Sequence, residues 1–186
     1  MEKERKNTTT KQTYRFIKSD SILNDMKSDY SLSDNEYRII HSFYLQLFSQ
    51  DTQNRLKQFG WNQISLEGNR ITEKLKQVLD LSKEQFVFTD KDDLSEQFQK
   101  KQLYDGQLTD WNEERFVIGK TRETNKYFKL FRHIRNCLAH CNYALRLAKG
   151  GTKMIIMQDH DEYNVTARIV LRQDTIERLI GCIVKN

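Results

Sequence analysis

The sequence contains no proline and only seven glycines in 186 residues. Both residue types interrupt regular helices, so their scarcity favours long, continuous helices. There are only three cysteines, Cys137, Cys141 and Cys182, and each lies in an apolar helical pattern. An odd number of cysteines in such patterns argues against a disulfide-stabilised secreted domain and favours reduced, buried thiols.

Long apolar runs are also missing, and the longest apolar stretches are far too short to span a bilayer. The charged start, Met1–Lys6, leads into asparagine and threonine rather than the apolar segment of a signal peptide. We therefore expect a soluble, cytoplasmic protein with no membrane partner.

Phosphate-binding glycine loops are absent as well, because the seven glycines fit no P-loop or dinucleotide-binding pattern. We expect no cofactor. The 31 basic and 26 acidic residues give a net charge of +5, which permits a polyanionic partner such as RNA without requiring one.

The apolar spacing predicts one mainly α domain over residues 13–186, after a frayed segment over residues 1–12. A short helix is expected over 14–26, and Ser33 and Glu36 form a capping box that opens a strong amphipathic helix. Apolar spacing predicts another helix over 71–79. Residues 89–114 are polar and are expected to form an insertion or a peripheral helix with a loop. Two β-branched runs predict a β-hairpin over 152–172, and a second capping box, Asp174 to Glu177, opens a final helix over 174–185.

The most informative helix is expected from about Arg122 to Ala148, with Gly150-Gly151 as its stop signal. Its apolar stripe must face the core and comprises Tyr127, Leu130, Phe131, Ile134, Cys137, Leu138, Cys141 and Leu145. Arg132, Asn136, His140 and Tyr143 fall on the opposite side, and Arg135 lies on the flank, about 100° from Asn136. The outward face therefore combines a permanent cation, a carboxamide and a proton carrier.

Simpler explanations compete with a functional site. Arginine and histidine are common on ordinary solvated helix faces. A zinc site built from His133, Cys137, His140 and Cys141 is disfavoured, because His140 and the two cysteines point in opposite directions. His41 is expected to be a partly buried structural histidine. His160 is expected in an exposed turn, where Asp159 and Asp161 are explained by turn chemistry without a bound cation.

The segment Arg135-Asn136-Cys137-Leu138-Ala139-His140 resembles the Arg-x(4–6)-His signature of HEPN domains, in its common form with asparagine after arginine. The close match covers about 20 residues, and Cys141 stands where a glycine is typical. The resemblance implies a HEPN-like antiparallel helical bundle. The predicted hairpin and short final helix resemble an addition found in a subgroup of bacterial HEPN proteins.

The resemblance also implies a metal-independent endoribonuclease that acts as a homodimer through the motif helix. His140 would move a proton to or from the ribose 2′-hydroxyl or the 5′-oxygen, and Arg135 would neutralise charge on the transition state. Asn136 would orient the histidine or hold the dimer cleft. Arg132, Tyr143 and Arg146 would contact the RNA. The products would be a 2′,3′-cyclic phosphate and a 5′-hydroxyl. The protein would act as a toxin or an anti-phage, abortive-infection effector, with an antitoxin or regulatory protein as its partner.

Two other functions remain open. A non-catalytic HEPN subunit would bind a nucleotide or a partner protein within a toxin–antitoxin or defence complex. A plain nucleic-acid-binding helical protein would show strongly salt-dependent binding without cleavage.

Overall fold

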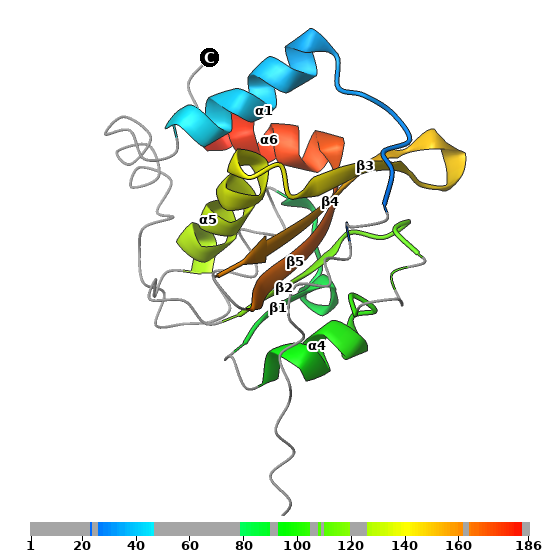
Figure 1. Ribbon diagram of the computed structural model, residues 1–186, viewed down its shortest axis with the longest axis vertical. Coiled ribbons are helices and arrows are strands. Elements are labelled where there is room, and N and C mark those ends of the chain that lie inside the picture. The colour runs from blue at the N-terminus through cyan, green and yellow to red at the C-terminus, as the bar shows by residue number, and fades with distance from the viewer. Residues whose placement is uncertain are drawn as a thin grey trace, which may run out of the picture.

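A five-stranded mixed sheet forms the centre of the protein, with strand order β1-β2-β5-β4-β3 (Figure 1). The computed structural model describes residues 23, 26–46, 79–89, 93–104, 108, 110–119, 126–161 and 164–183. The strands are β1 (Phe86–Phe88), β2 (Arg115–Ile118), β3 (Tyr143–Leu147), β4 (Lys153–His160) and β5 (Val165–Arg172). Strands β1 and β2 are parallel, and the other neighbours are antiparallel.

Helices cover both faces of this sheet. One buried cluster combines α1 (Asp34–Gln46), α5 (Lys126–Ala139) and α6 (Gln173–Ile183) with sheet residues such as Ile155 and Met157. A second cluster combines α4 (Leu94–Lys100) with Met154 and Ile156, the alternate positions of the same strand. Successive strand residues point to opposite faces, so β4 contributes to both clusters. Two short 3₁₀ turns, Lys83–Gln85 and Lys149–Gly151, complete the described elements.

The prediction of a mainly α, HEPN-like helical bundle is therefore wrong. The predicted hairpin exists as β4 and β5, but it lies in the middle of the sheet rather than beside a bundle. Residues 154–159 of β4 and 166–171 of β5 are all buried. A hairpin that is apolar on both faces needs neighbouring strands at its edges and helices above and below it, and β2, β3 and the four described helices provide them.

The motif helix ends at Ala139, nine residues before the predicted end at Ala148. Cys141 adopts a left-handed conformation with φ of 54°. The Asn142 N–H donates to the Cys137 carbonyl at 2.8 Å, and the Cys141 N–H to the Leu138 carbonyl at 3.4 Å. These bonds are the Schellman pattern that closes a helix C-terminus. The chain then turns back as β3, which pairs with β4.

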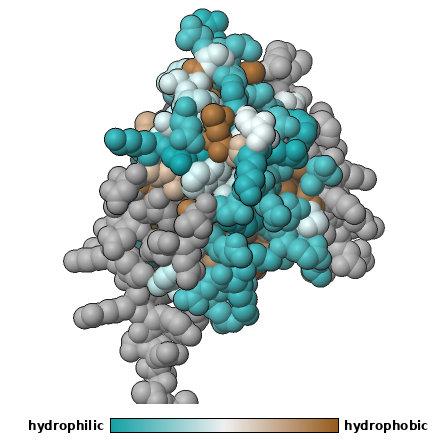
Figure 2. Space-filling view, turned by 90° about the vertical axis from the view of Figure 1, so that its right-hand side faces the viewer, coloured by the Kyte–Doolittle hydropathy of each residue, from teal (hydrophilic) through white to brown (hydrophobic). Residues whose placement is uncertain are grey.

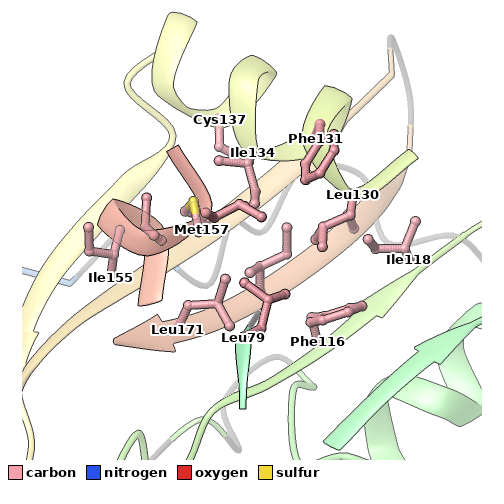
Figure 3. Close-up of a cluster of buried hydrophobic side chains, with 14 of the residues drawn as sticks. Leu79, Phe116, Ile118, Leu130, Phe131, Ile134, Cys137, Ile155, Met157 and Leu171 are labelled. Carbon is pink, nitrogen blue, oxygen red and sulfur yellow. The ribbon is translucent and has the colours of Figure 1, made fainter. Parts of the chain in front are cut away.

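The core-facing stripe of α5 is confirmed up to this turn. Leu130, Phe131, Ile134 and Cys137 are fully buried, and Figure 3 shows them packed toward the sheet residues Met157 and Ile118. Cys141, within the turn, is exposed, contrary to the prediction.

The segment 89–114 is not peripheral where the structure describes it. Leu94, Phe98 and Leu103 are buried in the cluster on the second face of the sheet. The buried Arg168 of β5 donates from Nη1 to the Leu103 carbonyl at 2.7 Å and lies over the Phe98 ring, 4.8 Å from its centroid. Because most of this segment is polar, its composition did not indicate the few apolar residues that cover the sheet.

At the helix starts, one expectation is confirmed and one is wrong. The Ser33 N–H donates to Glu36 at 2.7 Å, and the Glu36 N–H to the Ser33 hydroxyl at 3.4 Å, which is the predicted capping box. The final helix begins at Gln173, where Glu177 accepts a hydrogen bond from the Gln173 carboxamide, so Asp174 is not its cap.

Other expectations lie outside the described residues: the frayed segment 1–12, nearly all of the helices over 14–26 and 71–79, and the side chains of Tyr127 and Cys182. In the part of the chain that the structure describes, no helix has the length and apolar character needed to cross a membrane.

Candidate functional site

Four of the six predicted site residues lie at the C-terminal end of α5. Arg132, Arg135 and Asn136 belong to its last two turns, and His140 follows immediately after Ala139. Arg132 and His140 are exposed, whereas Arg135 and Asn136 are half-buried. The outward face proposed from the helical spacing therefore exists, but it is shorter than predicted.

Beneath this face lies a buried histidine–aspartate pair. His133 of α5 is 2% exposed and Asp159 of β4 is 4% exposed. The His133 Nδ1 atom lies 2.6 Å from the Asp159 Oδ2 atom. Since a carboxylate can only accept, the imidazole Nδ1–H is the donor in this bond. The pair joins the motif helix to β4, the first strand of the hairpin.

Asn136 extends the pair toward the surface. Its side-chain amide donates to the same Asp159 oxygen at 3.1 Å. Its carbonyl oxygen accepts from Arg135 Nη1 at 3.4 Å. These two bonds orient the carboxamide, since its nitrogen faces a carboxylate and its oxygen faces a guanidinium. Asp159 therefore influences the position of Arg135 through Asn136.

The other oxygen of Asp159 holds the end of β4. Asp159 Oδ1 accepts the backbone N–H of His160 at 3.0 Å. The ring Nδ1 of His160 lies 3.4 Å from the Asn142 side-chain nitrogen, and the Asn142 carbonyl accepts the Gln158 N–H at 3.2 Å. His160 is exposed, as expected, but it ends a strand beside the C-terminal turn of α5.

The predicted RNA-binding residues are not brought together. Tyr143 and Arg146 lie on β3, not on the motif helix, and their odd spacing places them on opposite faces of the sheet. Tyr143 lines a shallow pocket with Cys141 and Leu138, and burial raises the pKa of its hydroxyl. Arg146 Nη1 donates to the Lys27 carbonyl at 2.6 Å, and its guanidinium lies 4.3 Å from the centre of the Trp111 ring. Arg132 alone keeps the expected position on the motif face.

The cysteines differ from each other in environment. Cys137 is buried, and its desolvation raises the pKa of the thiol well above the usual value. Cys141 is exposed at the helix-ending turn. Among the described side chains, no group of three or more histidine, cysteine, aspartate or glutamate residues is placed to hold a metal ion.

Sequence reasoning missed Asp159, His133, Asn142 and His160 as one connected group. One signal was present: His133 lies three and four residues from Leu130 and Cys137, which places it beside the buried stripe. Asp159 gave no such signal, because acidic residues are typical of turns and its burial depends on α5 packing over β4.

No family model matches the chain, and no curated protein or solved structure is significantly similar to it. The molecule's function is therefore inferred from its own side chains.

Figure 2 shows one face of the molecule on which hydrophilic residues dominate and hydrophobic residues form only small, separate patches. Among the described residues, this face presents no broad apolar surface.

Proposed function

We propose that the protein is a metal-independent endoribonuclease that uses the residues at the C-terminal end of α5. The observation that carries the proposal is an exposed His140 at the end of the helix that carries Arg135, whose guanidinium contacts the Asp159-bound carboxamide of Asn136. A proton carrier and a permanent cation are the groups that phosphodiester cleavage by an internal nucleophile requires.

In this mechanism His140 accepts the proton of the ribose 2′-hydroxyl. The O2′–P bond forms, the P–O5′ bond breaks, and a proton is delivered to the departing 5′-oxygen. Arg135 stabilises the charge that builds on the phosphorus oxygens. The products are a 2′,3′-cyclic phosphate and a 5′-hydroxyl. Asn136 acts through Arg135 rather than by touching the substrate.

The proposal depends on these side chains and not on a helical-bundle fold. A second copy of α5 facing the first, with its exposed Arg132, would complete a cleft with two cationic halves. The biological role that fits is a cytoplasmic toxin or anti-phage effector, with an antitoxin or regulatory protein as its partner.

Purified protein should cleave total cellular RNA in the presence of EDTA and leave 2′,3′-cyclic phosphate ends. We expect His140→Ala and Arg135→Ala each to lower the rate by about 100-fold or more, the magnitude typical of a lost proton-transfer or charge-stabilising group. Arg178→Ala is the matched control, because Arg178 is exposed on α6 and its side-chain partners among the described residues are Asp174 and Thr175.

Undiminished cleavage by the His140→Ala variant would contradict this assignment, and loss of activity in EDTA would contradict the metal-free mechanism. Overexpression adds a cellular test. Growth should arrest with the wild type and continue with Arg135→Ala.

One observation favours the non-catalytic alternative. Asn136 is committed to a contact between α5 and β4, so part of the motif serves to hold the fold together. A binding subunit of a defence complex, or a plain nucleic-acid-binding protein, would retain salt-dependent RNA binding but release no cyclic-phosphate ends.

A further inference from the structure

A small pocket lies between α1, the start of β3 and the turn that ends α5. Cys141 lines this pocket and directly follows His140, so the Cα atoms of the two residues are about 3.8 Å apart. The pocket has a volume of about 50 Å³. One water molecule needs about 10–15 Å³, so there is room for about four. This space suits one six-membered ring and is too small for two fused rings.

The wall of the pocket is largely apolar. Leu32, Ile40 and Leu138 form this part of the lining. No lysine, arginine, aspartate or glutamate is among the described residues that line it. A phosphate group would have no cation to pair with there, so the pocket favours an uncharged ligand.

Two tyrosine hydroxyls add polar groups to this lining. Within the described part of the chain, neither the Tyr37 nor the Tyr143 hydroxyl has a hydrogen-bond partner. Burial, together with the nearby Cys141 and Tyr37, raises the pKa of the Tyr143 hydroxyl. It therefore stays protonated at neutral pH and can both donate and accept. A mainly apolar pocket with a few available polar groups is the usual form of a site for a small organic ligand.

Tyr37 also provides an aromatic surface. It is 48% exposed, and its ring centroid lies 4.3 Å from that of His41, with 44° between the ring planes. His41 therefore supports the ring, while nearly half of Tyr37 remains accessible. Unpaired RNA bases are recognised by stacking on such rings and by hydrogen bonds to their polar edges.

We propose that this pocket binds a pyrimidine base of the RNA, with the base stacked on Tyr37 and its polar edge hydrogen-bonded to the Tyr143 hydroxyl. This inference rests on the proposed ribonuclease function and gives that function a base preference. The size of the pocket disfavours purines, and its uncharged lining disfavours the phosphate. The available hydroxyls favour a ring with a polar edge over an apolar side chain of a partner protein.

Binding is tested with uridine alone, which examines the pocket apart from any cleavage. Uridine should shift the amide NMR signals of residues around Tyr37, Leu138 and Tyr143, and adenosine should shift them much less. Tyr143→Phe removes only a hydroxyl and should weaken uridine binding about threefold to tenfold. Tyr37→Ala removes the stacking surface and should weaken it about tenfold or more. Tyr104→Phe is the matched control, because Tyr104 packs against the cluster on the other face of the sheet, and it should bind uridine like the wild type.

Cys141 gives a second measure of occupancy, because it lines the pocket and is exposed. Saturating uridine should slow the alkylation of Cys141 by iodoacetamide severalfold. Adenosine at the same concentration should have little effect.

Cleavage should follow the same preference. With RNA oligonucleotides that differ in one base next to the cleaved bond, kcat/KM should be about tenfold or more higher for a pyrimidine than for a purine. Tyr37→Ala should lose most of this difference.

Absence of uridine binding, equal binding of adenosine, or unchanged binding by Tyr37→Ala and Tyr143→Phe would overturn the pyrimidine site and leave the ribonuclease proposal standing. Equally tight binding of N-acetylphenylalaninamide would overturn it in favour of a pocket for a partner's apolar side chain. Uridine binding as expected without any RNA cleavage would overturn the ribonuclease proposal and leave a site for a pyrimidine nucleoside.

Discussion

The buried pair of His133 and Asp159 should be the most sensitive polar contact of the described structure. The two side chains are almost fully enclosed and their atoms lie 2.6 Å apart. Asp159→Ala would leave the His133 N–H and the Asn136 amide without their acceptor in the interior. Loss of a hydrogen bond to a charged group costs about 1.5–3 kcal/mol, and loss of one member of a buried pair about 3–5 kcal/mol. We expect the free energy of unfolding to fall by about 4 kcal/mol.

Urea denaturation followed by circular dichroism at 222 nm measures this loss. A double-mutant cycle with His133→Leu isolates the pair. The His133 Nε2 atom is buried without a hydrogen-bond partner among the described residues, so the pair itself carries a cost. Combining Asp159→Ala with His133→Leu should therefore destabilise the protein less than the sum of the two single changes, with a coupling of about 2–3 kcal/mol. Effects that add to within about 0.5 kcal/mol would refute this reasoning.

Three further predictions concern other parts of the fold. Cys141→Gly should raise the unfolding free energy by about 1 kcal/mol and Tm by about 2–4 °C, because glycine adopts the left-handed conformation without strain; a lower Tm would contradict this. Iodoacetamide should alkylate Cys141 in the folded protein and spare Cys137, whose thiol is buried. Peptide mass spectrometry locates the modified cysteine, and alkylation of Cys137 in place of Cys141 would contradict the prediction. Contacts with Lys153, Ser33 and the Gln173 carboxamide lower the pKa of Glu36 from 4.5 to about 2. This stabilisation is therefore fully present above pH 4.5 and is lost as the pH falls through about 2. Glu36→Gln should reduce stability by about 1 kcal/mol at pH 6, with the difference shrinking toward pH 2 in urea titrations, and a difference that does not change with pH would argue against the ion pair.

Several local features could be predicted from the sequence because they depend on neighbours along the chain. The apolar spacing of Leu130, Ile134 and Cys137 identified the buried face of α5, and the Ser33–Glu36 pair identified the start of α1. Two runs rich in β-branched residues located the hairpin to within a residue or two. Each of these patterns acts within four residues, or within one strand and its turn.

The end of α5 could not be predicted in the same way. Residues 143–147, Tyr-Ala-Leu-Arg-Leu, carry apolar residues at positions that suit either a helix or a strand. Pairing with residues 153–157 of β4 satisfies the backbone of this segment as a strand, and the Asp29 N–H donates to the Leu145 carbonyl at 2.7 Å from another part of the chain. These partners are distant in sequence, so no local sequence pattern predicts the pairing.

The chain alone thus indicated the helix that carries Arg135 and leads into His140, and which side of that helix faces the core. The folded molecule placed Asp159 beneath that helix and His160 beside its last turn. A buried carboxylate is stable only where donors meet it, and His133, Asn136 and the His160 backbone meet Asp159 only because β4 packs under α5. These side-chain contacts join residues that are separated by 23 and 26 positions in the sequence. They therefore arise from packing, which is a property of the whole fold.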